Sequence, residues 1–382
     1  MARVGIGIIG GGYMGKLHAA AFRAVATVFE TDLRPELVAV CASTPESAER
    51  YRARYGFQSA TPDWRDVIAN PKVDAVVVAS PQETHAEITL AAIAAGKHVL
   101  CEKPLAVTVD ECVAMTDAAL AAGITHMTGF NYIKTPATQH ALSLVKDGAI
   151  GDVTWFRGEH TEDFYADPDA AATWRTERRA NGTMGDLSPH MIQCALAFMG
   201  PIASVSASID TVHAERPDGA GGRRAVTNDD IAHMMCRFAR GQTGHLMFSR
   251  IATGRKMGYA YELFGTKGAI RFNQEDQNAL WLYQSDGAAA NRGFTKILAG
   301  PAHPDYWAFC QGPGHGTGYL DQIIIEAAHF LKAIAAGTSA WPDFRVGLAV
   351  QQVVAAAWTS SETGHWQTVA GHDATPSKAS SA

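Results

Sequence analysis

A glycine-rich loop near the start of the chain constrains the fold more than any other feature. Residues 10–15 read GGGYMG, which matches G-x-G-x-x-G, and they directly follow the apolar run 4–9. This pattern predicts a strand that turns sharply into a helix, whose N-terminus binds the pyrophosphate of a dinucleotide. The alternative is a glycine-rich turn without a ligand. The residues expected at the dinucleotide site are Gly10 for the turn, Gly12 for close approach of the phosphates, Tyr13, Met14, and Gly15 for helix–strand packing.

Up to residue 130 the chain alternates between short apolar runs and helical stretches. The apolar runs predict buried strands over residues 4–9, 37–42, 75–79, 99–100 and 125–130. Thr44, Thr84 and Thr108 mark helix starts, the last two with capping-box spacing to Glu87 and Glu111, and Gly56, Gly96 and Gly123 mark helix ends. This order predicts a doubly wound parallel sheet, a Rossmann domain of residues 1–130.

After residue 130 the pattern changes to strand-like runs separated by glycine-containing turns. It predicts a large, open, mainly antiparallel sheet in an α+β domain of residues 131–370, so the chain is α/β overall. Two helices, one ending at Gly337 and one over residues 343–360, are expected to close this domain. Residues 371–382 are polar and small and read as a flexible tail. Since two helices cover only one face of the sheet, we expect a homodimer or homotetramer.

Composition narrows the class of protein. The formal net charge of −6 offers no basic field for nucleic acid, so no nucleic-acid partner is expected. No apolar run approaches a membrane span, and the N-terminus has no small-residue cleavage site after its apolar run. The six cysteines are scattered without a C-x-x-C pair, which indicates reduced thiols and a cytoplasmic protein. No metal site is expected.

The end of the second predicted strand bears on the choice of cofactor. A carboxylate usually stands there and binds the ribose 2′-hydroxyl of NAD. In this chain the positions hold Ala42, Ser43 and Thr44. Two hydroxyls and a helix N-terminus suit a 2′-phosphate, so we expect Ser43 and Thr44 to contact the cofactor and NADP to be favoured over NAD. The alternative is that Thr44 is only a helix cap and that NAD binds without the acid.

Two further strand ends carry polar residues at the edge of the sheet where open α/β folds bind ligands. Ser80 and Pro81 follow the third of the predicted strands, and His85 begins the next helix, either as a cofactor contact or as a packing residue. Glu102 and Lys103 follow the fourth strand and precede Pro104. An ammonium fixed at this edge points to a catalytic or cofactor-binding role, whereas the alternative is a surface turn.

The chain resembles the glucose–fructose oxidoreductase/inositol dehydrogenase (Gfo/Idh/MocA) family over nearly its whole length. The motifs that carry the resemblance are the glycine loop, SPQETHAE, AGKHVLCEKPLA, GFNYIKTPA and NGTMGDLSPHMIQ. The resemblance implies hydride transfer between NAD(P) and a secondary hydroxyl of a sugar, glycoside or cyclitol. It places the family's catalytic residues on Lys103, Asp186 and His190. It also favours a cis peptide bond between Lys103 and Pro104.

The chemistry of these three residues agrees with that reaction. An imidazole such as His190 titrates near neutral pH and can accept the hydroxyl proton. Asp186 lies one helical turn before it, and Lys103 supplies a cation for the developing alkoxide. The chain departs from the family at Ser188, where a glycine is frequent, and at Ile133, where many members have arginine next to what is here Lys134.

Several residues suit a polyhydroxylated substrate. The positions expected to contact it are Asn131, Tyr132, Arg157, Asp163, Trp174, Arg175 and His315. The stretches EDFYADP, GGRRAVTNDD and GPGHGTGY look most like the subgroup that acts on levoglucosan and other glucosides. Two other functions stay open: an NAD-dependent glycosidase that oxidises its sugar transiently, and a dinucleotide-binding regulator without catalysis. Which sugar or cyclitol reacts, at which carbon and in which direction, is open as well.

Overall fold

The computed structural model describes residues 2–371, which form two compact units. Among the described residues, the first unit contains 2–135, 305–311 and 317–351, and the second contains 136–304, 312–316 and 352–371. The expected boundaries, 1–130 and 131–370, therefore differ from the observed units, because two later segments return to the first. The expected tail, apart from residue 371, lies outside the described residues.

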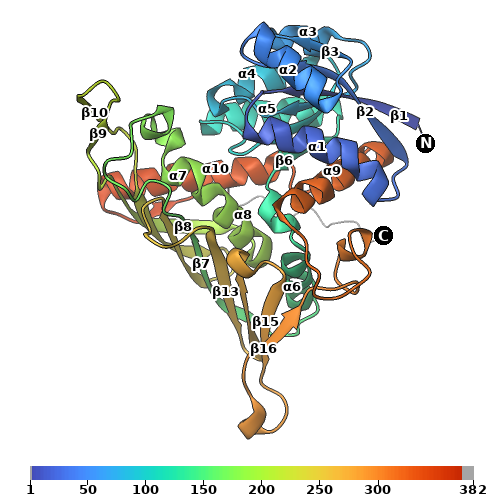
Figure 1. The fold of residues 1–382 in the computed structure, drawn as a ribbon. Helices are drawn as coiled ribbons and strands as arrows, with labels where there is room; N and C mark the ends of the chain where they lie inside the picture. Colours follow the sequence, from blue (N-terminus) through green and yellow to red (C-terminus); the bar gives the residue numbers. More distant parts are fainter. Residues whose placement is uncertain (1, 372–382) are drawn as a thin grey trace. The chain divides into compact units, whose positions relative to one another are not determined.

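The first unit is built on a six-stranded parallel sheet with the order β3-β2-β1-β4-β5-β6 (Figure 1). Its strands are β1 (Ala2–Ile9), β2 (Leu33–Cys41), β3 (Ser59–Thr61), β4 (Ala75–Val78), β5 (His98–Glu102) and β6 (His126–Gly129). Its helices include α1 (Tyr13–Val28), α2 (Pro45–Tyr55), α3 (Trp64–Ala69), α4 (His85–Ala94) and α5 (Val109–Ala122). Every residue of β4 is buried, as expected for a central parallel strand covered on both faces. The predicted Rossmann domain is confirmed, with β3 as a strand that the sequence analysis missed.

Local capping signals set most helix ends of this unit. The Thr44 hydroxyl accepts from the Ser47 N–H at the start of α2, and Gly56 ends that helix with a φ of 74°. Thr108 and Glu111 form the predicted capping box of α5. The capping box expected at Thr84 is wrong, because its hydroxyl bonds the carbonyl of Pro81 instead and α4 begins without a side-chain cap.

Helix α9 (Tyr319–Ala336) belongs to the first unit, although we expected it to close the second domain. It ends at Gly337, as predicted. Its apolar stripe, which includes Ile323, Ile324 and Ala327, is buried in one core with residues of β1 and α1. Figure 1 shows α9 beside α1. The stripe predicts that a helix is buried on one face but does not identify the partner of that face.

The second unit contains a nine-stranded open sheet of the order β16-β15-β14-β13-β7-β12-β11-β8-β17. All neighbours pair antiparallel except β7 and β12, which are parallel, so the prediction of a mainly antiparallel sheet is confirmed. The strands are β7 (Val153–Thr161), β8 (Ile202–Asp210), β11 (Ile231–Phe238), β12 (Thr243–Ser249), β13 (Gly258–Gly265), β14 (Gly268–Asn273), β15 (Ala279–Gln284), β16 (Thr295–Leu298) and β17 (Gln367–Thr368). A separate hairpin joins β9 (Glu215–Pro217) and β10 (Arg223–Ala225).

One face of this sheet is covered by helices and the other is open. The helices of the second unit are α6 (Pro136–Lys146), α7 (Thr183–Asp186), α8 (Ser188–Met199) and the last part of α10 (Phe344–Thr363). Helix α8 packs closely on β7, where a Cβ on Gly158 would lie 2.5 Å from Met191 Sδ. Along β11, buried and exposed residues alternate, as a strand with one covered face requires.

Beyond the apolar core, the second unit buries an ion pair. Arg250 Nε donates to Asp230 Oδ1 at 2.9 Å, and both side chains are almost completely inaccessible to solvent. Asp230 Oδ2 also accepts from the backbone N–H groups of Val212 and His213.

Among residues 2–371, no helix combines the length and apolar composition that crossing a bilayer requires. The six cysteines carry thiols, and five of them are buried.

We predict that Asp230→Ala lowers the free energy of unfolding by about 3–5 kcal/mol, because the guanidinium of Arg250 stays buried without its carboxylate. The matched control is Asp276→Ala, which removes a 2.6 Å ion pair with Lys296 whose side chains are 53% and 39% exposed. The control should change stability by less than ~1 kcal/mol. Urea denaturation measures both, and equal effects of the two substitutions would contradict the prediction.

Candidate active site

The glycine loop has the geometry that a dinucleotide requires. Gly10 has a φ of +128°, and a Cβ there would lie 2.2 Å from the carbonyl oxygen of Ala79. A Cβ on Gly15 would lie 1.9 Å from the Gly10 carbonyl oxygen, so the packing of α1 on β1 depends on this glycine. A Cβ on Gly12 would meet nothing within 4 Å, which leaves room for a phosphate beside the backbone.

The N-terminus of α1 is suited to an anion. The helix begins at Tyr13 after the cap Gly12, with no acidic residue in its first turn and no side-chain cap. Its first N–H groups and its dipole therefore favour a phosphate at this end. Tyr13 is 63% exposed and stacks on Tyr319 with ring centroids 6.3 Å apart, and the Tyr319 hydroxyl lies 3.9 Å from Met14 Sδ.

At the end of β2 the structure shows features that act in opposite directions on a 2′-phosphate. Ala42 is buried and places no charge there, while Ser43 is exposed. The Thr44 hydroxyl is engaged as the cap of α2. In the first turn of α2, the pKa of Glu46 is lowered by hydrogen bonds from its own backbone and from Thr44, so this carboxylate is ionised beside the helix N-terminus.

His85 ties together the loops that follow β4 and β5. Its Nε2 lies 3.0 Å from the Ser80 carbonyl oxygen and its Nδ1 lies 2.9 Å from the Pro104 carbonyl oxygen. The side chain is buried, and burial lowers the pKa of its imidazole. Both ring nitrogens therefore face main-chain oxygens, which supports the packing role for His85. Ser80 itself bonds the Thr84 hydroxyl, and Pro81 precedes the short helical turn of residues 82–84.

The end of β5 holds the Glu-Lys-Pro motif. The bond between Lys103 and Pro104 is cis, as predicted. Glu102 is buried, and its Oε1 lies 2.7 Å from Nε2 of His18, a residue of α1 that the sequence analysis did not single out. Among the expected substrate residues of this unit, Asn131 donates to Gln322 at 2.9 Å and Tyr132 packs 5.8 Å from Tyr319. Both are buried within the first unit.

The second unit brings three of the expected residues together. Arg175 donates from Nη1 to Asp186 Oδ2 at 3.1 Å, and its guanidinium lies 4.5 Å from the ring centroid of Trp174. Trp174 is 61% exposed. An exposed aromatic face beside an arginine and a carboxylate is suited to a sugar ring with its hydroxyl groups.

His190 lies four residues after Asp186, in the first turn of α8, and it is buried. Its ring lies 5.7 Å from that of His160 on β7. His160 Nδ1 bonds the Leu187 carbonyl oxygen at 2.9 Å, and its Nε2 lies 3.2 Å from Glu162 Oε1. His160 was missed from the sequence, although its even position along β7 places it on the face that α8 covers.

A polar network fixes the segment that carries Arg175 and Asp186. Asp229 Oδ2 accepts from the Met184 N–H at 2.7 Å, and Arg250 donates to the Arg175 carbonyl oxygen at 2.8 Å. Asn228 contacts the same carbonyl at 2.9 Å. Burial raises the pKa of Asp229 to about 6. The stretch TNDD (residues 227–230) therefore helps to hold the loop that carries Arg175. In the sequence analysis we related this stretch only to a subgroup of the family.

Three other expected substrate residues do not join this group. Arg157 lies on the open face of the sheet, opposite to the face that α8 covers, and pairs with Glu262 at 3.0 Å. Asp163 accepts from Lys256 at 2.6 Å, and this contact lowers the pKa of its carboxyl group. His315 is exposed, and its ring packs against Gly312.

The two departures from the family pattern are absorbed inside the protein. Ser188 donates from its hydroxyl to the Met184 carbonyl oxygen at 2.6 Å and is buried. Ile133 and Lys134 are buried as well. Lys134 donates to the Trp341 carbonyl oxygen at 2.6 Å, and burial lowers its pKa to about 8. Lys134 therefore does not present its ammonium to solvent in place of the family's arginine.

Comparisons with known proteins cover nearly the whole chain. Residues 4–130 match the GFO/IDH/MocA oxidoreductase family with its NAD-binding Rossmann fold, and residues 138–271 match the GFO/IDH/MocA C-terminal domain. Levoglucosan dehydrogenase of Pseudarthrobacter phenanthrenivorans is 37% identical over 96% of this chain and 98% of that protein. Inositol 2-dehydrogenase of Rhizobium meliloti is 27% identical over 93% of this chain and 96% of its own. The structure of a levoglucosan dehydrogenase in complex with NADH and levoglucosan has a TM-score of 0.93 and 38% identity, covering 96% of this chain and 100% of that one.

The contrast between two glycines gives a test of the loop. We predict that Gly12→Ala weakens NADH binding at least about tenfold while leaving stability unchanged, because its methyl group occupies only the space that the phosphate needs. Gly15→Ala should weaken binding and also lower the melting temperature, because its Cβ would overlap the Gly10 carbonyl oxygen. Fluorescence titration with NADH and thermal denaturation measure the two effects. Normal NADH affinity in Gly12→Ala would contradict the assignment of the loop.

Proposed function

Because the chain belongs to the GFO/IDH/MocA oxidoreductase family, we propose that it oxidises a ring hydroxyl of levoglucosan or a closely related glucoside. The chain is an NAD-dependent oxidoreductase that acts on a sugar or cyclitol. The finer assignment rests on one observation above the others, which is the likeness to levoglucosan dehydrogenase along almost the entire chain. The exposed Trp174 beside Arg175 and Asp186 supports it.

We assign the proton transfer to His190. Oxidation of a secondary alcohol releases the hydroxyl proton to a base while hydride leaves the same carbon, and a bound nicotinamide supplies the hydride acceptor. His190 accepts that proton, Asp186 supports the developing positive charge, and Lys103 stabilises the alkoxide oxygen. The main-chain N–H groups of α1 and the space beside Gly12 hold the pyrophosphate.

A substrate panel tests the proposal. Levoglucosan, simple glucosides, glucose and myo-inositol are each incubated with NAD, and the formation of NADH and of the keto sugar is followed. We expect levoglucosan or a glucoside to give the highest kcat/KM and myo-inositol a much lower one. Release of free sugar from a glycoside without net NADH would indicate the transient-oxidation glycosidase. No turnover with any sugar, despite tight NADH binding, would indicate a regulator.

The roles of His190 and Lys103 predict different kinetic losses. His190→Ala should lower kcat by about 10²–10⁴-fold. It should also remove the fall in activity at low pH, since a protonated imidazole cannot accept the hydroxyl proton. Lys103→Ala should lower kcat and kcat/KM together, since the alkoxide forms only near the transition state.

The pH–rate profile of His190→Ala decides between two assignments of the base. If Lys103 were the base instead, the low-pH limb would persist in His190→Ala and disappear in Lys103→Ala. NADH affinity serves as the control for both variants and should be unchanged, because the glycine loop holds the phosphates. A limb retained in His190→Ala would overturn our assignment.

The preference for NADP over NAD stays a prediction. It rests on Ala42, which leaves the ribose without a carboxylate, whereas the ionised Glu46 in the first turn of α2 opposes it. Ala42→Asp should shift the relative affinity toward NAD by roughly 1–3 kcal/mol, the scale of one polar contact left unsatisfied. Glu46→Gln should shift it in the other direction. Titration of both cofactors measures the two shifts, and tighter binding of NAD by the unchanged chain would refute the preference.

We further propose that the open face of the second unit's sheet associates with a second copy. Met235 is 53% exposed there and Trp155 is 38% exposed, next to Phe264 at a ring distance of 4.8 Å. Exposed large apolar side chains on an open sheet face favour a partner surface. Light scattering should give a dimer or tetramer, and Met235→Glu should shift it toward the monomer. A monomeric mass of the unchanged chain at micromolar concentration would refute the proposal.

A cytoplasmic location of the protein also stays a prediction.

A further inference from the structure

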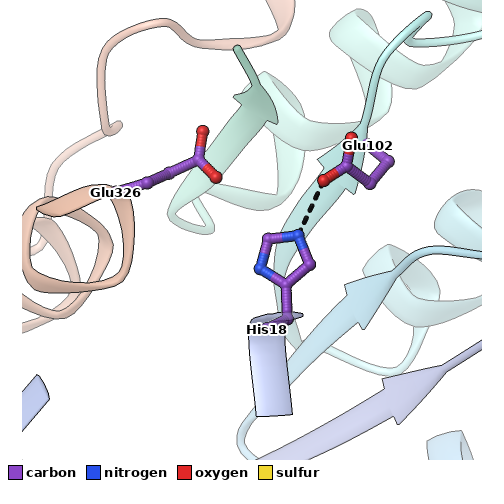
Figure 2. A group of neighbouring side chains, drawn as sticks. All are labelled: His18, Glu102 and Glu326. Carbon is purple, nitrogen blue, oxygen red and sulfur yellow. Dashed lines mark hydrogen bonds and ion pairs between the residues drawn. The ribbon is translucent and has the colours of Figure 1, made fainter. Parts of the chain in front are cut away.

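Three buried ionisable side chains from separate elements of the first unit converge behind the Glu-Lys-Pro motif. They are His18 of α1, Glu102 of β5 and Glu326 of α9 (Figure 2). One ligand atom from each lies within 4.8 Å of the others, and none of the three side chains is exposed to solvent. In Figure 2 the Glu326 carboxyl group points toward Glu102 and His18. Neither the assigned reaction nor the dinucleotide loop uses His18 or Glu326.

The charges in this cluster do not balance if both carboxyl groups are ionised. His18 Nε2 lies 2.7 Å from Glu102 Oε1, which is the distance of a hydrogen bond between an imidazole N–H and a carboxylate oxygen. Both oxygens of Glu326 lie buried without a hydrogen-bond partner among the described residues. An ionised carboxylate in such a place is costly, and a second one beside it costs more. Burial first, and then the charge of Glu102, raise the pKa of Glu326 well above its usual value, although Lys134 opposes the shift.

Glu102 connects this cluster to the lysine of the motif. While Oε1 binds His18, Oε2 accepts from the backbone N–H of Lys103 at 3.3 Å. The same carboxylate is confined on another side, because a Cβ on Gly129 would lie 3.0 Å from it. One carboxylate therefore links helix α1, which follows the dinucleotide loop, to the peptide group from which the Lys103 side chain extends.

We propose that His18 is a positioning residue for Lys103 and acts through Glu102. In this arrangement Glu326 is a neutral carboxylic acid, Glu102 is the single carboxylate of the cluster, and His18 holds that carboxylate against the Lys103 peptide group. Removal of the His18 donor frees Glu102 to rotate, and the lysine loses its fixed position relative to the alkoxide. This inference rests on the proposed role of Lys103 in the reaction.

The same donors are of the types that bind divalent cations, since imidazole nitrogen and carboxylate oxygen are common ligands. One observation favours the hydrogen-bonded arrangement over a metal ion. The distance of 2.7 Å between His18 Nε2 and Glu102 Oε1 is that of a charge-assisted hydrogen bond.

The first experiment compares two substitutions of His18. His18→Leu removes the donor. We expect kcat to fall about 10- to 100-fold, because a small misplacement of a catalytic group has an effect of this size. The KM for the sugar and the Kd for NADH should stay within about threefold, since neither site is touched. His18→Gln restores an N–H donor at the position of Nε2 and should recover most of the kcat. Folded His18→Leu with a kcat within twofold of the unchanged enzyme would overturn the proposal.

A matched control separates positioning from stability. His126 is another buried histidine of the first unit. Its Nε2 lies 3.0 Å from the Ser339 hydroxyl and its Nδ1 accepts from the Phe344 N–H at 3.2 Å, so both ring nitrogens bond partners other than Glu102. His126→Gln should lower the melting temperature and leave kcat of the folded enzyme near normal. Equal losses of kcat in His126→Gln and His18→Leu at similar stability would show that His18 acts only through stability, and would overturn the proposal.

The second experiment does not depend on turnover or on the folding of His18→Leu. Infrared spectroscopy at neutral pH should show the C=O stretch of a protonated carboxylic acid that is lost in Glu326→Gln and kept in the exposed control Glu30→Gln. Absence of that band, or about one bound metal ion per chain that Glu326→Gln removes, would overturn the neutral state of Glu326. If the sugar panel shows no reaction but the band is present, the proposed function fails while this state of the cluster stands.

Discussion

The close packing of α1 on β1 is the constraint on which the first unit depends. Without side chains at Gly10 and Gly15, the first turn of α1 lies against the loop that leads into it. This contact orients the helix so that its N-terminus is open to an anion and its next turn carries His18 inward to Glu102. A methyl group on Gly15 would move the helix, and with it both the phosphate site and the buried polar cluster. The dinucleotide loop and the position of the lysine motif are thus consequences of one packing contact.

In the second unit, buried polar and charged side chains fix the segment with the candidate catalytic residues. The loop before α7 carries Trp174 and Arg175, both exposed in part, and such a loop has little apolar surface to bury. Its carbonyl groups are instead held by Asn228 and by Arg250, whose own charge is balanced by Asp230. Hydrogen bonds from buried charged groups are stronger and more directional than apolar contacts, so they suit a loop that must hold one conformation while facing solvent.

The sequence predicted what is encoded locally and missed what depends on distant partners. The caps at Thr44 and Thr108 and the stop at Gly337 were predictable, because each interaction lies within one helical turn. The partner of α9 was not, because an apolar stripe fits any apolar surface, and the helix packs on α1 instead of the second sheet. Arg157 and His160 show the same limit. Their alternation along β7 separates them onto two faces, but only the later helix α8 determines which face is covered.

The departures from the family pattern add no polar group to the candidate sugar site. Many family members have arginine at position 133, where this chain has a buried isoleucine. The neighbouring Lys134 is also buried, and its ammonium donates to the Trp341 carbonyl oxygen. At 188 the serine hydroxyl donates to the Met184 carbonyl oxygen of the preceding helix α7. Neither change leaves a polar group available for a substrate. The group that does offer exposed polar and aromatic surface is Trp174 with Arg175, beside Asp186. The network of Asn228, Asp229 and Arg250 sets the conformation of that segment, so we expect changes in this buried network to alter the candidate sugar site as much as changes in the exposed residues.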